Sequence, residues 1–458
     1  MSKTSTRFAL PAAALLALGT QAAWAKAPVA EAEQLGKNLT CTGAEKAGNK
    51  DGSIPEFSGK WLGVPPGVSF KGTGTIHPDP YAAEKPLYTV TAGNMAQHAD
   101  KLSDGQKALL QKYPQTFTIP VFVSHRDFRF PDWRCAVVKE NALKADLVDG
   151  GMGVNATRGG VPFPIPKTGL ELLWNMNLPP RAMTEEAQYD QAVVYPNGNI
   201  AWGRNSYRIL AVSEDPNFTP KTTEGVSANF NVKTLLPERN KGEIIVGQEY
   251  YNYKTSPRGA WQYNPGTRRV RQLPAFGFDM PQGPGGFRTV DDDRLFNGSP
   301  ERYDWTIVGK REVLVPYNAY RLDDPKLKYA DLLKPGHPNP DAMRYELHRV
   351  WVLQATLKEG FRHQYAKRVI YMDEDSWQAL MADNYDARGQ LWRVAMQHTA
   401  YAYEASLFQA RVAVYHDLTS GAYLADRLVN EAAKAPLINA GNLKPDMFTG
   451  EFAREEGK

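Results

Sequence analysis

The sequence predicts a mainly β fold of the α+β class: a large curved antiparallel sheet or an unclosed barrel, a few covering helices and a long irregular N-terminal lobe. From about residue 190 onward, polar and apolar residues alternate with a period of two, which is typical of strands with one buried face. Short polar turns join these segments, and consecutive strands with short connections form an antiparallel meander. Strands and helices do not alternate along the chain, so a doubly wound nucleotide-binding fold is disfavoured.

Turn and capping residues set the individual elements. Pro196-Asn197-Gly198-Asn199 and Asn264-Pro265-Gly266-Thr267 predict two hairpins, the first between residues 191–195 and 200–204 and the second between 260–263 and 268–271. Further strands are expected at 243–251, 305–315, 346–357, 365–372, 389–396 and 411–416. Helices are expected at 28–36, 94–113 and 169–177.

The first 25 residues fit a secretory signal peptide. Lys3 and Arg7 supply positive charge, residues 8–18 are apolar, and Ala23 and Ala25 suit signal peptidase, so cleavage after Ala25 is expected. The apolar run is short for a membrane span, which disfavours the alternative of an uncleaved anchor. We therefore expect a periplasmic protein of a Gram-negative bacterium. Its predicted parts are the signal peptide (1–25), the irregular lobe (26–165), the antiparallel core (166–425) and a C-terminal tail (426–458).

Charge and cysteine content narrow the classes of partner and of chemistry. The net charge of the chain is +4 and falls to +2 without Lys3 and Arg7, which gives no reason to expect a nucleic-acid partner. Cys41 and Cys135 are the only cysteines. In an oxidising compartment such a pair favours one disulfide, and two free thiols are the alternative.

No motif for catalysis or for a cofactor stands out. The chain has no Gly-x-Ser-x-Gly elbow, no phosphate-binding Gly-x-x-x-x-Gly-Lys-Ser/Thr loop and no dinucleotide-binding Gly-x-Gly-x-x-Gly. Its eight histidines include no i,i+4 pair, so a zinc site would need ligands gathered from distant segments. We expect no catalytic residue, no cofactor and no metal, and we expect most histidines at the surface or half-buried.

Two acidic runs invite other interpretations. Residues 291–293 are three aspartates that would suit a hard cation, but Leu295 and Phe296 stand where a calcium loop needs a ligand and a glycine. A solvated loop is therefore the preferred interpretation. Glu374 and Asp375 could form a catalytic pair, but at a hairpin tip before Ser376 a capping or turn role explains them better.

Aromatic residues that alternate with charged ones predict one apolar face of the sheet. If the sheet is open or wide, that face lines an apolar cavity; from the pattern alone, an ordinary packed core is the stronger alternative. The candidate lining residues, chosen by alternation, are Trp261, Tyr263, Val270, Trp351, Leu353, Tyr371, Trp392 and Val394.

Three segments are candidates for contact with a protein partner. They are the Pro-rich strap 161–166, the loop 283–305 and a basic strip on one predicted strand. The strip could meet acidic groups or lipid headgroups, and its alternative is a solvated face that guards a sheet edge. The individual candidates are Phe163, Arg268, Arg269, Arg271, Asn297, Arg302 and Trp305.

Several longer strings resemble one family. They are residues 35–49, 160–166, 296–305, 315–318 and 345–352, which include Pro162-Phe163-Pro164-Ile165-Pro166 and Phe296-Asn297-Gly298-Ser299-Pro300. Together they resemble an exported bacterial family catalogued as domain of unknown function 1329, over almost the whole mature chain. Cys41 departs from the usual residue of that family, which would make the disulfide peculiar to this member. The stretch 260–271 is similar to a hairpin of the LolA/LolB-like carriers, which are unclosed antiparallel barrels with a helical lid.

The resemblance implies a non-enzymatic periplasmic carrier or chaperone of hydrophobic cargo between the inner and outer membranes. The cargo would be a lipid, lipoprotein acyl chains or a sterol-like molecule. Its implied partners are an inner-membrane exporter of the resistance-nodulation-division type and an outer-membrane protein, with transient membrane contact. The resemblance supplies no catalytic residues. Two alternatives stay open: an interaction protein that docks to an envelope transporter or outer-membrane protein without cargo, and a secreted hydrolase.

Overall fold

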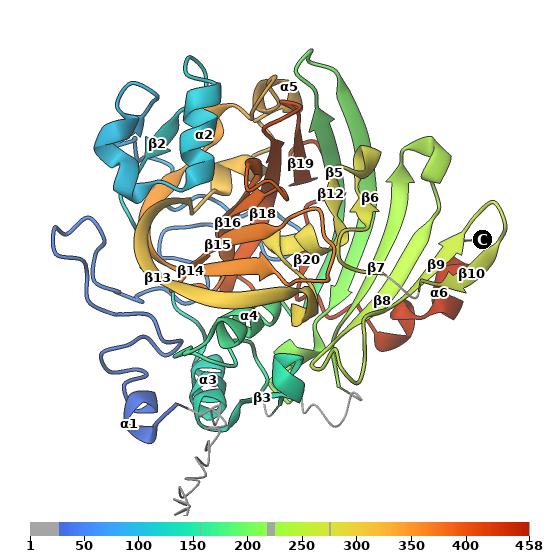
Figure 1. Cartoon of the computed structure of the whole chain (residues 1–458), viewed down its shortest axis with the longest axis horizontal. Helices are drawn as coiled ribbons and strands as arrows, with labels where there is room; N and C mark the ends of the chain where they lie inside the picture. Colours follow the sequence, from blue (N-terminus) through green and yellow to red (C-terminus); the bar gives the residue numbers. More distant parts are fainter. Residues whose placement is uncertain (1–26, 156, 218–224, 274–275, 458) are drawn as a thin grey trace, which may run out of the picture.

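A computed structural model describes residues 27–457 apart from 156, 218–224 and 274–275. The described chain is mainly β and is dominated by one large sheet, which does not close over the described strands (Figure 1). The predicted signal peptide lies outside the described residues. Among the described helices, none is both long and apolar enough to cross a membrane.

The main sheet has the strand order β1-β2-β14-β15-β16-β17-β18-β19-β5-β6-β7-β8-β9-β10, with β13 paired to β14 and β20 to β5. Its pairs are antiparallel except for β2 with β14. The strands are β1 (Tyr88–Val90), β2 (Ile119–Val121), β5 (Thr184–Val194), β6 (Ile200–Leu210), β7 (Val226–Leu236), β8 (Ile244–Tyr250), β9 (Gly259–Asn264), β10 (Arg269–Gln272), β13 (Tyr303–Pro316), β14 (Tyr345–Leu357), β15 (Lys367–Asp373), β16 (Ala379–Tyr385), β17 (Leu391–Ala402), β18 (Leu407–Asp417), β19 (Tyr423–Leu428) and β20 (Leu437–Ile438).

Two short strand pairs and several helices complete the described fold. The pairs are β3 (Asp146–Val148) with β4 (Gly153–Asn155), and β11 (Pro281–Gln282) with β12 (Arg288–Thr289). The α-helices are α1 (Val29–Ala32), α2 (Asp104–Lys112), α3 (Asp132–Lys144), α4 (Gly169–Asn177), α5 (Tyr329–Leu332) and α6 (Gly450–Glu456). The mainly β, open architecture confirms the predicted fold class.

Local sequence signals account for many of these elements. Both predicted hairpins are confirmed, because β5 pairs with β6 and β9 with β10 across the expected turns. Helix α4 has the predicted bounds and begins with a capping box between Thr168 and Glu171. The predicted helix 94–113 is divided into a 3-10 segment, Met95–Lys101, and α2, because Ser103 and Gln106 form a capping box that starts a new helix. The predicted helix 28–36 is shorter, with only Val29–Ala32 helical.

The central strands β13 to β19 are covered on both faces. On one face, Leu109 and Leu110 of α2 belong to the same buried cluster as Val350 and Val394. On the opposite face, Leu172 and Leu173 of α4 share a cluster with strand residues such as Leu353, Ile370 and Ala395. The strands therefore contribute side chains to two separate packed layers, and this part of the sheet is a filled core.

The outer strands fan away from this core (Figure 1). Helix α6, close to the C-terminal end, lies beside β9 and β10 and packs Ala453 against Tyr263, Trp261 and Val270. The opposite face of β7 to β9 contacts the segment that precedes β13, through a buried cluster with Phe276 and Val290. The short strands β1 and β2 therefore form one end of the strand order, and α6 packs at the other end, beside β9 and β10.

Candidate functional site

A disulfide joins the N-terminal segment to helix α3. Cys41 and Cys135 are bonded with an S–S distance of 2.05 Å, across a sequence separation of 94 residues. The predicted disulfide is confirmed. Near it, Trp377 donates its indole N–H to the backbone carbonyl of Thr42 at 2.8 Å, so this segment is also fixed to the turn after β15.

The eight residues predicted to line a cavity lie in different layers. Trp261, Tyr263 and Val270 come together, but α6 covers them. Trp351 and Leu353 belong to the layer under α4, whereas Tyr371 and Val394 belong to the layer under α2. The Trp392 indole packs against Tyr365 and donates to Asp417. All eight residues are described, and none lines either of the two cavities found beside the N-terminal lobe.

The predicted partner contacts differ in exposure. Phe163 is half-buried against Trp174. Its backbone N–H donates to the side-chain oxygen of Asn175 in α4 at 2.8 Å, and its carbonyl accepts from the Asn175 side-chain nitrogen at 2.7 Å. Trp305 and Asn297 are buried, while Arg302 is half-buried and lies over the ring of Phe278 at 3.6 Å. The basic strip is exposed around the edge strand β10, as Arg268, Arg269 and Arg271. Of the predicted contacts, the strip is therefore the part open to solvent.

The larger cavity lies where the strap of residues 76–84 meets the end of β13 and the start of β14. It has a volume of about 570 Å³ and is lined by aromatic rings together with charged groups of both signs. The lining residues are Ile76, His77, Pro78, Asp79, Tyr81, Ala82, Glu84, Phe122, Asn318, Ala319, Tyr320, Arg321, Asp324, Ala342 and Arg344. Alternation along strands could not have found this site, because most of these residues belong to loops.

A network of paired charges supports one wall of this cavity. Arg344 donates to Glu84 at 2.8 Å and to Glu346 at 2.7 Å, and its guanidinium lies over the rings of Tyr81 and Phe122. The His125 ring stacks on Tyr81 with centroids 3.9 Å apart. Because these side chains are held by several partners each, the wall is rigid before any ligand enters.

A smaller and more apolar cavity adjoins the disulfide. Its volume is about 190 Å³. Both cysteines border it, together with Phe57, Phe128, Phe130, Tyr401 and Phe408, and Asp375 contributes a carboxylate at its edge.

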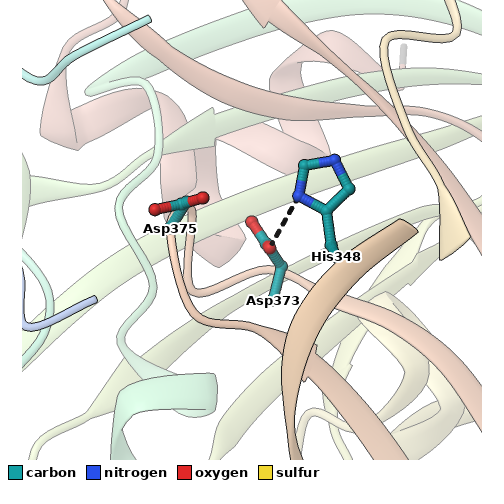
Figure 2. A group of neighbouring side chains, drawn as sticks. All are labelled: His348, Asp373 and Asp375. Carbon is teal, nitrogen blue, oxygen red and sulfur yellow. Dashed lines mark ion pairs between the residues drawn. The ribbon is translucent and has the colours of Figure 1, made fainter. Parts of the chain in front are cut away.

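A buried cluster of charges lies between the two cavities, and we call it the His348 cluster. It consists of Glu346 and His348 on β14 with Asp373, Glu374 and Asp375 at the end of β15, and Figure 2 shows three of these side chains facing one another. Arg126 reaches it from the N-terminal lobe and holds both oxygens of Asp375, at 2.7 and 2.8 Å. Glu374 accepts from Lys310 at 2.8 Å and pairs with Arg349 at 3.0 Å. The predicted turn role of Glu374 and Asp375 is therefore incomplete, because both also carry buried ion pairs.

The protonation of the cluster follows from burial and from its cations. Burial alone would raise the pKa of Glu346, but Arg344 and His348 lower it to about 2. For Glu374, burial and the neighbouring Asp375 charge outweigh Lys310 and Arg349 and raise the pKa to about 7. Within the described residues of the cluster, the Ser376 hydroxyl donates to Asp373 at 2.6 Å and not to a histidine. The cluster thus lacks the serine–histidine pair that a hydrolase of that type requires.

A second buried charge cluster, the Arg368 cluster, corrects the interpretation of the acidic run 291–293. Asp291 and Asp292 are buried, and Arg368 donates to them at 2.9 Å each. His363 pairs with Asp291 at 3.0 Å. The prediction of a solvated loop was wrong because the neutralising cation comes from β15, far along the chain.

The expectation for the histidines was also wrong. His98 and His125 are half-buried, the side chain of His363 is enclosed, and the other five histidines are buried: His77, His337, His348, His398 and His416. His348, His398 and His416 lie on central strands whose two faces are both covered, so these polar strand residues are enclosed as well.

Sequence comparison establishes the family. The chain belongs to the family described as a protein of unknown function, DUF1329, whose model matches residues 89–453. It is also 42% identical over 433 residues to the uncharacterized protein PA3922 of Pseudomonas aeruginosa, with 93% of each chain covered.

Two solved structures resemble the chain at low sequence identity. A DUF1329 family protein from Desulfovibrio piger is 13% identical, with 62% of this chain and 97% of that chain covered and a TM-score of 0.41. The LolA superfamily protein NE2245 from Nitrosomonas europaea is 13% identical, with 63% and 100% covered and a TM-score of 0.36.

Proposed function

We propose that this protein is a non-enzymatic carrier that works in the bacterial envelope and holds an amphiphilic ligand in the larger cavity. The observation that carries the proposal is the cavity of about 570 Å³, whose lining combines aromatic faces with charged groups of both signs. Small-molecule sites commonly have volumes of about 300–1,000 Å³ and a few convergent polar groups. An acyl or sterol-like body with a charged or polar group matches this lining better than a purely apolar cargo does.

Each part of such a ligand finds complementary groups. Phe122, Tyr81 and Tyr320 offer aromatic surface, and burial of apolar area is worth about 25 cal/mol per Å². Arg321 is exposed and borders the cavity, where it suits an anionic headgroup. Arg344, by contrast, is already paired with Glu84 and Glu346, so its role is to hold the wall in place.

The cellular location in this proposal is the periplasm. The Cys41–Cys135 disulfide fits an oxidising compartment, and the predicted signal peptide would direct export there. The proposed partners are an inner-membrane exporter and an outer-membrane protein, between which the carrier would move cargo. The exposed basic strip Arg268, Arg269 and Arg271 is the part of the surface best suited to transient contact with anionic lipids.

The test introduces a large side chain at the edge of the larger cavity. Ala82 is exposed and lines the cavity, whereas the adjacent Ala83 is exposed and does not. The substitution Ala82→Trp should reduce binding of a fluorescent fatty acid or of a sterol-like anion at least tenfold, while Ala83→Trp should leave it unchanged. Titration of the three purified proteins at matched concentration measures this difference.

Two results would contradict the proposal. One is the absence of saturable binding of either probe class by the wild-type protein. The other is equal affinity in the Ala82→Trp and wild-type proteins, which would put the ligand elsewhere. Circular dichroism and the melting temperature of both variants show whether each has kept its fold.

A further inference from the structure

Three side chains of the His348 cluster converge as metal ligands do. His348, Asp373 and Asp375 each offer one ligand atom, and these atoms lie within 4.8 Å of one another. Figure 2 shows the Asp373 carboxylate between the other two side chains. The three residues come from β14, the last position of β15 and the turn that follows, so the register of this hairpin brings them together.

An unsatisfied acceptor points into this group. Asp373 is fully buried, and its Oδ2 accepts from the Tyr317 hydroxyl at 3.0 Å and from the backbone and hydroxyl of Ser376 at 2.8 and 2.6 Å. Its Oδ1 has no hydrogen-bond partner among the described residues and lies 3.6 Å from Nδ1 of His348, an ion-pair distance if that imidazole is protonated. A buried carboxylate oxygen without a partner is costly, and a bound cation would satisfy it.

Neighbouring side chains hold the three converging residues in position. Nε2 of His348 lies 3.2 Å from the Glu346 carboxylate, which favours the tautomer with a proton on Nε2 and a free lone pair on Nδ1. Tyr317 and Ser376 fix the Asp373 carboxylate through its other oxygen, and Arg126 fixes Asp375. Each oxygen of Asp375 keeps a second lone pair beside its hydrogen bond to Arg126.

We propose that His348, Asp373 and Asp375 bind one divalent transition-metal ion, with Zn²⁺ the best match. One imidazole nitrogen with two carboxylate oxygens suits Zn²⁺ better than Ca²⁺ or Mg²⁺, which prefer all-oxygen sites. Three protein ligands leave a position for water. The ion would link β14 to the turn after β15, independently of cargo in the larger cavity.

One of the three proposed ligands borders a cavity. Asp375 borders the smaller cavity, next to Thr42 and Lys46 of the N-terminal segment. An ion that enters this cavity can meet the Asp375 carboxylate.

The experiment measures binding of Zn²⁺ and Co²⁺ to the purified mature protein after chelator treatment. Equilibrium dialysis with elemental analysis should give one Zn²⁺ per chain, and Co²⁺ should give visible absorption bands from a nitrogen- and oxygen-ligated ion. The variants His348→Gln and Asp373→Asn should weaken Zn²⁺ binding at least tenfold and abolish the Co²⁺ bands. His98→Gln, which changes a half-buried histidine stacked on Tyr88, should change neither.

Folding of each variant is checked by its melting temperature in excess chelator. If His348→Gln or Asp373→Asn fails to fold, the wild-type protein still decides, because the proposal requires one saturable Co²⁺ site with its absorption bands. Wild-type protein that takes up no Zn²⁺ or Co²⁺ above the background of a histidine-free control protein would overturn the proposal. So would Zn²⁺ affinity that is the same in folded His348→Gln and wild-type proteins.

Discussion

The Arg368 and His348 clusters are built from the same residue types, but they differ in whether every carboxylate oxygen has a protein partner. In the Arg368 cluster, each carboxylate oxygen of Asp291 and Asp292 has a protein partner: Arg368, His363, Thr289 or Tyr365. In the His348 cluster, Arg126 donates to both oxygens of Asp375. Oδ1 of Asp373, by contrast, has no hydrogen-bond partner among the described residues.

This difference separates a structural ion network from a candidate binding site. A buried charge set whose carboxylate oxygens all have protein partners holds elements together and has no acceptor left for a cation. One that leaves a buried acceptor beside an imidazole, close to a second carboxylate that borders a cavity, retains the capacity to bind a cation. We therefore expect substitutions in the two clusters to have different effects.

The largest effect should come from the cation of the Arg368 cluster. Arg368→Met leaves two buried carboxylates without their counter-charge and should lower the free energy of unfolding by about 5 kcal/mol. Chemical denaturation measures this loss. Arg388→Met, at a site where the side chain is 80% exposed, is the matched control and should change it by less than about 0.5 kcal/mol. A similar small loss in both variants would show that the cluster is not a structural network.

Removal of the disulfide should have the next largest effect and should distinguish the clusters. Cys41→Ala with Cys135→Ala frees a long loop and should cost about 4 kcal/mol of unfolding free energy. The freed segment also contacts the turn after Asp373, through Thr42 and Trp377. Hydrogen exchange should therefore accelerate more around residues 374–378 than around Arg368, where only the global loss of stability acts. Equal acceleration at both places would contradict a local link between the disulfide and the His348 cluster.

The buried carboxylate of Asp383 should have a smaller effect on the free energy of unfolding, and this effect should depend on pH. Burial raises the pKa of Asp383 from 3.8 to about 6, although the backbone N–H of Gly105 and the hydroxyls of Tyr371 and Ser103 donate to its carboxylate. The folded state therefore binds a proton more tightly than the unfolded state, and stability should fall as pH rises from about 4 to about 6. Asp383→Asn should remove roughly 2–3 kcal/mol of that fall. Chemical denaturation across this pH range measures the change in unfolding free energy, and Asp304→Asn at an exposed position is the control. The same dependence of unfolding free energy on pH in both variants would contradict a raised pKa of Asp383.

Local signals were enough to predict much of the fold. Turn chemistry located the hairpins β5–β6 and β9–β10, and the helix predicted at 169–177 has the bounds of α4. The missed elements include the strands β7, β16 and β19, the helices α3 and α6, and several short strands. Strand β16 is buried at every position, so it shows no alternation between polar and apolar residues that could have revealed it.

The candidate sites were harder to predict because they depend on long-range contacts. Alternation selected Leu353 and Tyr371 together, yet they lie in different packed layers, since both faces of the central strands are buried. The cavity wall joins Glu84 to Arg344, and the His348 cluster joins Arg126 to Asp375. No sequence spacing signals such pairs, because only the tertiary fold brings the lobe onto the sheet.

The most direct test of the carrier proposal is native mass spectrometry of the protein isolated under mild conditions from the envelope of its own host. The wild-type and Ala83→Trp proteins should carry the same bound amphiphile at up to one copy per chain, and Ala82→Trp should carry none. Wild-type protein that is consistently free of ligand, or a ligand retained in full by Ala82→Trp, would contradict the proposal.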